Sequence, residues 1–111
     1  MVKNYKTDLI KKLKQYESKD VIFTEHAEVR AQFRRIDLEE IKNNLLDPKR
    51  LVFANKINAD KKSETKYDCY FGYSKTHAHR YIIVVNRKVI IVTVIKINRR
   101  WQRKAEKHGR I

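Results

Sequence analysis

The chain has 111 residues, of which 27 are lysine or arginine and 13 are aspartate or glutamate, giving a formal net charge of +14. This length fits one domain with one modest core, and so basic a body attracts polyanions, with nucleic acid first among them. The apolar runs are far shorter than the roughly 20 residues of a membrane-spanning helix, and MVKNYKTD at the start lacks the apolar core of a signal peptide. We therefore expect a cytoplasmic protein.

The first half of the chain predicts helices. Residues 5–17 place apolar side chains at helical spacing between lysines, which indicates an amphipathic helix. A second helix begins near Thr24, which is suited to the N-cap, and a third begins at Asp37, with Glu40 three residues later as in a capping box. Pro48 ends the third helix.

The second half predicts strands, because β-branched and aromatic residues become frequent after Arg50. The expected strands cover residues 51–57, 66–74, 79–86 and 88–98. Short links between them favour an antiparallel meander. The expected fold class is α+β, with two or three N-terminal helices packed on a four-stranded antiparallel sheet whose other face stays partly open for RNA. A single domain would span residues 1–111: an N-terminal helix over 1–20, a core over 22–98 and a basic tail or short helix over 99–111.

A stripe of basic residues on the second helix is the first candidate site. His26, Arg30 and Arg34 are four residues apart and share one helix face, with Arg35 beside them. An imidazole near guanidinium groups can transfer a proton and grip a phosphate. The alternative is a solvated, charged helix face with no particular task.

The segment THAHR at 76–80 is the second candidate site. In a strand, His77 and His79 point the same way. One of them would act as a general acid or base, with Arg80 or a neighbour binding phosphate. The pair is a weak metal signal because no third ligand is evident, and the alternative is a polar strand entry with surface histidines.

The last strand and the tail carry the third candidate site. Lys96, Arg99, Arg100 and Arg103 surround Trp101, a pattern that fits a nucleic-acid surface on which the indole stacks and the cations meet the backbone. A solvated basic terminus is the alternative.

Motifs for other chemistry are missing from the sequence. It contains no P-loop, no dinucleotide fingerprint and no carboxylate pattern for a metal, and its single cysteine, Cys69, excludes an internal disulfide and is expected to be a small buried residue. No cofactor and no metal are expected. Histidines and arginines are the residue types that cleave RNA without metal, through the neighbouring 2′-hydroxyl.

The stretch FTEHAEVRAQFRRIDLEEI resembles the opening of a family of small domains that begin with H-A-x-x-R, followed by a second basic residue, an isoleucine and a capped helix. The resemblance covers about residues 22–97 and ends in a strand like VIIVTVI. That family is placed near the RelE and BrnT toxins, in the barnase–EndoU–colicin–RelE fold. Many members have glycine where this chain has Arg35, and we expect this difference to alter the turn between the second and third helices.

The resemblance implies a metal-independent endoribonuclease, the toxin of a toxin–antitoxin pair. His26, Arg30 and either His77 or His79 would form the catalytic set. The residues expected to bind nucleic acid are Arg34, Arg35, Arg80, Lys96, Arg99, Arg100, Trp101 and Arg103. The expected partners are RNA, including ribosome-bound mRNA, and an acidic antitoxin protein. The alternatives are a non-catalytic nucleic-acid- or ribosome-binding protein, and a structural or partner-binding module whose charge meets an acidic partner.

Overall fold

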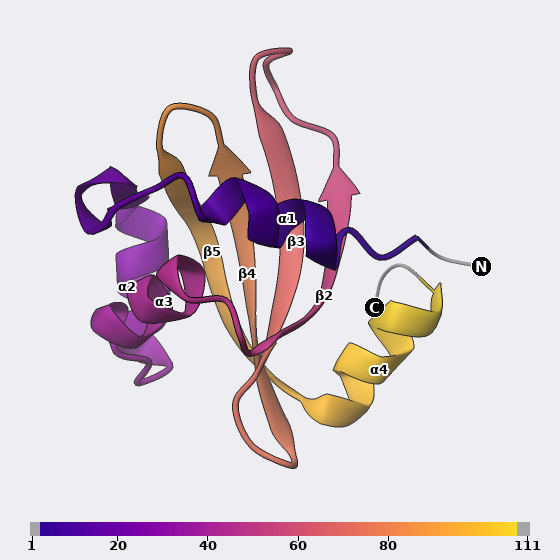
Figure 1. Cartoon of the computed structure of the whole chain (residues 1–111). Helices are drawn as coiled ribbons and strands as arrows, with labels where there is room; N and C mark the ends of the chain where they lie inside the picture. The colour runs from indigo at the N-terminus through magenta and orange to yellow at the C-terminus, as the bar shows by residue number, and fades with distance from the viewer. Residues whose placement is uncertain (1–2, 109–111) are drawn as a thin grey trace.

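The structure is a computed structural model that describes residues 3–108 (Figure 1). Its elements are α1 (Lys6–Leu13), the 3-10 turn η1 (Ser18–Asp20), β1 (Val21–Phe23), α2 (Glu25–Phe33), α3 (Leu38–Leu46), β2 (Leu51–Ile57), β3 (Thr65–Gly72), β4 (His77–Val85), β5 (Val89–Asn98) and α4 (Arg99–His108). The predicted α+β class is confirmed. The expected basic tail is largely α4, and its last residues, 109–111, lie outside the described residues.

The sheet differs from the prediction by one strand. Strands β2 to β5 form the expected antiparallel meander, but the full order is β1-β5-β4-β3-β2, and β1 pairs parallel with β5 from Val21↔Val89 to Phe23↔Ile91. A purely antiparallel, four-stranded sheet was therefore wrong. Three residues are too few to show the alternation that identifies a strand in a sequence, and the partner of β1 lies almost 70 residues away.

Side-chain caps start α2 and α3 where the sequence predicts. Thr24 Oγ1 accepts a hydrogen bond from the Ala27 amide at 3.1 Å, and Asp37 Oδ1 accepts one from the Glu39 amide at 3.0 Å. Each cap satisfies a helix N–H that lacks an internal partner. The third helix stops at Leu46, two residues before Pro48, as predicted. The first helix is shorter than expected and ends at Leu13.

The C-terminus of α2 is a tight turn with a residue of positive φ. The Ile36 amide donates to the Ala31 carbonyl at 2.8 Å and the Arg35 amide to the Gln32 carbonyl at 3.1 Å, which is the Schellman pattern. Arg35 has φ of 55°, in the left-handed region that favours glycine. This turn redirects the chain so that Asp37 can begin α3.

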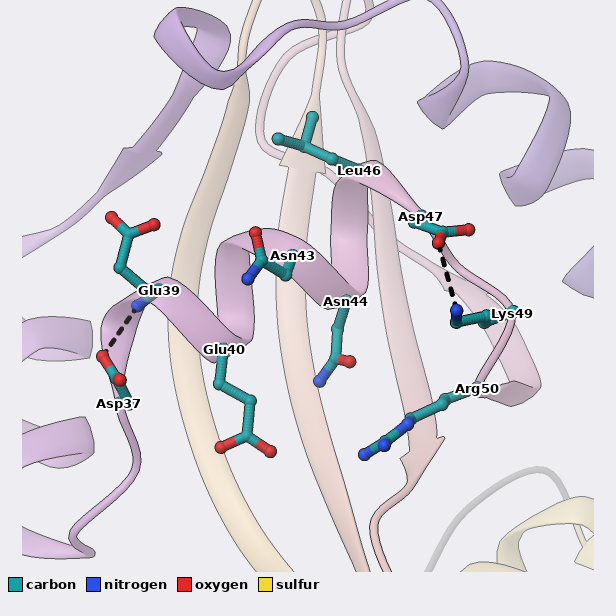
Figure 2. Close-up of a pocket in the computed structure, with 9 residues that line it drawn as sticks. All are labelled: Asp37, Glu39, Glu40, Asn43, Asn44, Leu46, Asp47, Lys49 and Arg50. Carbon is teal, nitrogen blue, oxygen red and sulfur yellow. Dashed lines mark hydrogen bonds and ion pairs between the residues drawn. The ribbon is translucent and has the colours of Figure 1, made fainter.

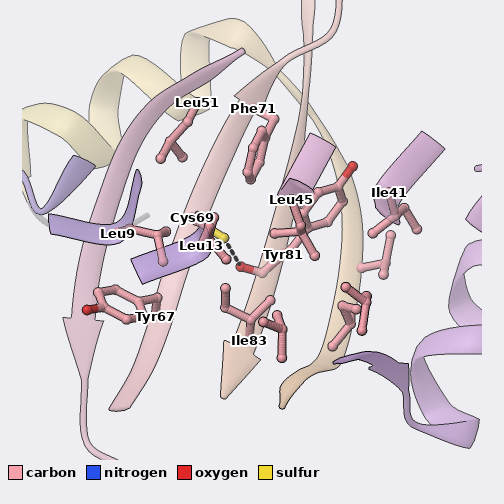
Figure 3. Close-up of a cluster of buried hydrophobic side chains, with 14 of the residues drawn as sticks. Leu9, Leu13, Ile41, Leu45, Leu51, Tyr67, Cys69, Phe71, Tyr81 and Ile83 are labelled. Atoms are coloured by element: carbon pink, nitrogen blue, oxygen red, sulfur yellow. Dashed lines mark hydrogen bonds between the residues drawn. The ribbon is translucent and has the colours of Figure 1, made fainter. Parts of the chain in front are cut away.

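The main core lies between the three N-terminal helices and one face of the sheet. Helix α1 crosses β2 and β3, while α2 and α3 lie towards β5 (Figure 1). Figure 3 shows this cluster, in which Leu9 and Leu13 of α1 and Ile41 and Leu45 of α3 meet residues of the central strands. The strand residues are Leu51, Tyr67, Cys69, Phe71, Tyr81 and Ile83. Cys69 is buried as expected, and burial raises the pKa of its thiol.

Helix α4 covers part of the opposite sheet face. Ala105 packs with Phe53 and Tyr70 in a second, smaller buried cluster. The same face continues over β4 with Ile82 and Val84, which are half-buried and offer no polar group to a phosphate.

Candidate active site

A cavity of about 560 Å³ opens beneath α3, and we call it the α3 cavity. Its lining residues are Asp37, Glu39, Glu40, Asn43, Asn44, Leu46, Asp47, Lys49 and Arg50. Figure 2 shows that Glu40, Asn44 and Arg50 project from the backbone toward the same space. A carboxylate, an amide and a guanidinium thus share one solvent-accessible volume.

Helix geometry and a short turn place these three side chains. Glu40 and Asn44 are four residues apart on α3, so they share one helix face. The chain then turns at Pro48, whose carbonyl accepts from the Leu51 amide at 3.2 Å. The Arg50 carbonyl accepts from the Gly72 amide at 2.9 Å, which ties the start of β2 to the end of β3.

A buried hydrogen-bonded chain extends from the cavity into the sheet. Asn44 Nδ2 donates to the Tyr81 hydroxyl at 3.0 Å, and that hydroxyl lies 2.8 Å from Nδ1 of His79. All three residues are buried. Because Tyr81 accepts from Asn44, its own proton is free to be donated to Nδ1 of His79, which leaves the imidazole proton on Nε2.

The surroundings of His79 keep its imidazole neutral. Its side chain is only 1% exposed, and burial, helped by the positive charges of Lys96 and Arg50, lowers its pKa to about 4. The Tyr73 ring stacks on the imidazole with centroids 4.6 Å apart and planes 18° apart, and Lys96 Nζ lies 4.9 Å from the Tyr73 ring centroid. At neutral pH His79 is therefore a fixed hydrogen-bonding group and carries no charge.

A second cavity, of about 360 Å³, lies beside the first and is shared by distant parts of the chain; we call it the basic groove. Its lining residues are Lys6, Lys49, Arg50, Leu51, Val52, Gly72, Tyr73, Ser74 and Arg99. Lys49 and Arg50 line both cavities. The α3 cavity has several carboxylates in its wall, whereas the charged residues that line the basic groove are all cations.

The structure separates His26 and Arg30 from these cavities. His26 lies in the first turn of α2, which starts beside Val92 of β5, because Thr24 Oγ1 donates to the Val92 carbonyl at 3.3 Å. His79 pairs with Lys96, four residues further along the same strand, or about 13 Å at the usual rise per residue. His26 and Arg30 are both exposed, and neither lines a cavity described above.

Arg34 and Arg35 have different environments although they are neighbours. Arg35 is exposed and occupies the left-handed position that ends α2. Arg34 is half-buried, and one of its terminal guanidinium nitrogens is buried without a hydrogen-bond partner among the described residues. Neither residue lines the α3 cavity or the basic groove.

The residues expected along β4 and β5 divide between the two sheet faces. Lys96 pairs with His79 on the sheet face covered by α1, α2 and α3, whereas Arg80 pairs with Ile95 on the opposite face. There the Arg80 guanidinium donates two hydrogen bonds to the Asp68 carboxylate, each of 2.8 Å. His77 is exposed at the start of β4, with Nδ1 2.9 Å from the Thr76 hydroxyl.

The basic residues expected after β5 all lie on α4. Arg99 reaches the basic groove, where its guanidinium donates to the Ser74 carbonyl at 3.0 Å. Arg100 and Lys104 lie over the Trp101 ring, at 5.7 and 4.6 Å from its centroid, and Arg103 is exposed. Trp101 is 40% exposed, so an indole with adjacent cations faces solvent.

The sequence singles out His79 and Lys96 but not the groups that surround them. Glu40 was assigned only to a helix cap, and Asn44, Arg50, Tyr73 and Tyr81 were not singled out. The one local signal was the spacing of four between Glu40 and Asn44 on an amphipathic helix. The rest of the site depends on how β2, β3 and β4 align.

Within residues 3–108, no group of three or more histidines, cysteines, aspartates or glutamates is placed to hold a metal ion. No helix in this described part of the chain is long and apolar enough to cross a membrane.

Residues 23–96 match the family model described as a domain of unknown function, DUF4258. The chain belongs to this family. The matched DUF4258 region runs from β1 through α2, α3 and the meander to Lys96, and so includes Glu40, Arg50 and His79, whereas α1 and α4 lie outside it. Neither the curated proteins nor the solved structures compared with this chain give a match.

Proposed function

We propose that this DUF4258 protein binds RNA and cleaves it without a metal ion, in the manner of a RelE-like endoribonuclease, at the α3 cavity. The observation that carries the proposal is the convergence of Glu40, Arg50 and the buried Asn44–Tyr81–His79 chain on one cavity in a protein of net charge +14. A base and a phosphate-binding cation are two of the groups that such a reaction needs, and the buried chain holds α3 against the sheet.

Each group has an assigned role in the proposed step. Glu40 takes the proton of the ribose 2′-hydroxyl as its oxygen attacks the adjacent phosphorus. The bond from phosphorus to the 5′-oxygen breaks, and that oxygen receives a proton from solvent water, because neither His77 nor His79 lines the α3 cavity. Arg50, which lines the α3 cavity, stabilises the charge on the phosphate. The products are a 2′,3′-cyclic phosphate and a 5′-hydroxyl.

His79 supports this site without exchanging a proton at neutral pH. Because the pKa of its buried imidazole is about 4, the ring stays neutral, and its Nδ1 is hydrogen-bonded to the Tyr81 hydroxyl. The chain through Tyr81 to Asn44 fixes the ring orientation and anchors α3 to the sheet. This positioning role replaces the acid–base role that the sequence suggested for His79.

The RelE-like relationship and the toxin role are part of the same proposal. Helices that precede a four-stranded antiparallel meander, here β2 to β5, support a relationship to that fold. A toxin of this kind would act on mRNA at the ribosome and be neutralised by an acidic antitoxin, a pairing that the excess positive charge favours. The site of action would be the cytoplasm.

The experiment that tests the proposal compares two glutamates that are neighbours on α3. Glu40→Gln removes the proposed base, and cleavage of a labelled RNA should fall by about 10²- to 10⁴-fold. Glu39→Gln, which makes the same change in charge at an exposed position in the cavity wall, should cleave within a few fold of wild type. Equal activity of both variants would remove Glu40 from the mechanism.

A second candidate function is RNA binding without cleavage. It is favoured by the lining of the α3 cavity, in which none of the described residues is a histidine that could act as general acid. In that case RNA would bind with strong salt dependence, and Glu40→Gln would strengthen binding slightly by removing a negative charge. Binding without any product in the wild-type protein would favour this candidate over the enzyme.

A further inference from the structure

We infer that the basic groove is a binding site for an RNA phosphate neighbouring the one at the α3 cavity, so that the substrate is a single-stranded segment lying across both. This inference rests on the proposed function and extends it from a cleavage site to a longer binding surface for the RNA strand. Four cations line the groove: Lys6 from α1, Lys49 and Arg50 before β2, and Arg99 from α4.

These cations come together from three distant parts of the chain. Of the described residues that line the groove, none is acidic. Lys49 lies 3.5 Å from Asp47, but this pair is highly exposed and adds little stability. Four positive groups around one cavity repel one another, and an anion bound there relieves that repulsion.

The groove wall holds Arg99 in place before any ligand arrives. Its guanidinium is fixed by the Ser74 carbonyl and by the Gln102 side chain, and its backbone amide donates to the Thr76 carbonyl at 2.7 Å. Gly72 makes room for it, since a Cβ atom there would come within 3.1 Å of a terminal guanidinium nitrogen. A cation fixed in this way loses little freedom when it binds a phosphate.

Arg50 and Tyr73 connect the groove to the proposed site of cleavage. Arg50 lines both cavities, so a strand that passes it has one phosphate on either side. Tyr73 is 44% exposed, lines the groove and stacks on His79. An aromatic ring beside a row of cations fits an unpaired nucleotide, whose base packs on the ring while its phosphate meets the cations.

The test measures binding of a 2′-O-methylated 12-nucleotide single-stranded RNA, which lacks the 2′-hydroxyl needed for cleavage. The variant Lys6→Gln/Lys49→Gln removes two groove cations. The matched control Lys11→Gln/Lys14→Gln removes two exposed lysines in and just after α1 that do not line the groove. The groove variant should bind about tenfold more weakly and lower the slope of log Kd against log salt by about 0.7 for each lost contact. The control should remain close to wild type.

Equal weakening of both double variants would overturn the inference, because it would show that total charge alone attracts RNA. Wild-type binding by the groove variant, or no binding of this RNA by the wild-type protein, would overturn it as well. Tyr73→Leu should weaken binding about tenfold and Tyr73→Phe should not. The experiment also distinguishes this inference from the proposed function. If RNA binds through the groove but unmodified RNA is never cleaved, the enzyme proposal is wrong and the groove is still an RNA-binding site.

Discussion

The hydroxyl of Tyr81 lies 2.8 Å from Nδ1 of His79 in a buried part of the sheet beneath α3. The same hydroxyl accepts a hydrogen bond from Asn44, so one phenol joins a helix, a strand and the histidine. Burial of the phenol raises the pKa of Tyr81, which keeps its proton available for donation to Nδ1. This arrangement defines the protonation state of His79 and therefore predicts how the protein responds to acid.

The neutral state of His79 should make the protein acid-sensitive. The pKa of His79 is about 4 in the folded state, against about 6.5 in an unfolded chain. Between these values the unfolded state binds a proton that the folded state does not, so stability is complete above pH 6.5 and falls as the pH drops toward 4. The loss should approach about 3 kcal/mol across this window.

Urea unfolding at pH 7, 6, 5 and 4.5 would measure that loss. The difference in the free energy of unfolding between wild type and His79→Gln should become smaller as the pH falls, because the variant has no imidazole to protonate at this position. His77→Gln, an exposed histidine two residues away, serves as the control and should leave the pH dependence unchanged. Parallel curves for wild type and His79→Gln would contradict the assignment.

The ion pair between Asp68 and Arg80 should be a major structural contact. The Asp68 side chain is only 6% exposed, accepts both guanidinium bonds and also accepts from the Tyr70 hydroxyl at 3.2 Å. Asp68→Asn leaves a half-buried guanidinium without its counter-charge and should cost about 2–3 kcal/mol in the free energy of unfolding. Asp47→Asn breaks an exposed pair and should cost less than about 0.5 kcal/mol. Similar costs for the two variants would show that burial of the Asp68 pair is unimportant.

Arg35 should be a position where glycine stabilises the protein. Its φ of 55° is unfavourable for a side chain with a Cβ atom, and it occupies the C′ position of α2, where glycine is preferred. Arg35→Gly should therefore raise the free energy of unfolding by about 1 kcal/mol. Gln32→Gly, within the same helix, should lower it by a similar amount. Thermal and urea unfolding of the two variants provide the comparison, and a destabilised Arg35→Gly would refute the backbone argument.

His26 provides a direct comparison between the sequence-based hypothesis and the structure. If His26 were the catalytic base, as its stripe with Arg30 suggested, His26→Ala would abolish RNA cleavage. Because His26 lies on the exposed side of α2 and outside both cavities, we expect the variant to cleave within about threefold of wild type. A loss of cleavage activity close to that of Glu40→Gln would instead place the catalytic centre on α2.

Local signals explain which parts of the fold were predictable. Thr24, Asp37 and Pro48 mark helix boundaries through contacts within a few residues, and β-branched runs identify β4 and β5. The strand β1 was missed because its pairing with β5 is entirely long-range. Phe33, the last residue of α2, is 82% exposed, since the buried face of this helix carries the small residues Ala27 and Ala31 instead.

The candidate site was only partly predictable for the same reason. Alternation along β4 correctly put His77 and His79 on one face, but it could not show that Arg80 would form an ion pair with Asp68. His79 contacts Tyr81 on its own strand and Tyr73 after β3, and Tyr81 links it to Asn44 of α3. No spacing in the sequence connects α3 and the end of β3 to this histidine. The sequence pattern favours the basic stripe on α2 as the catalytic centre, whereas the tertiary packing favours Glu40 of α3.

The central claim is that the α3 cavity cleaves RNA through the 2′-hydroxyl and without a metal ion. The most direct measurement is analysis of the ends produced when the purified protein is incubated with a single-stranded RNA in the presence of excess EDTA. Attack by the 2′-hydroxyl should give fragments with a 2′,3′-cyclic phosphate on one side and a 5′-hydroxyl on the other, and no fragment at a position substituted with 2′-deoxyribose. Fragments that vanish with EDTA, ends that carry a 3′-hydroxyl and a 5′-phosphate, or intact RNA under all conditions would contradict it.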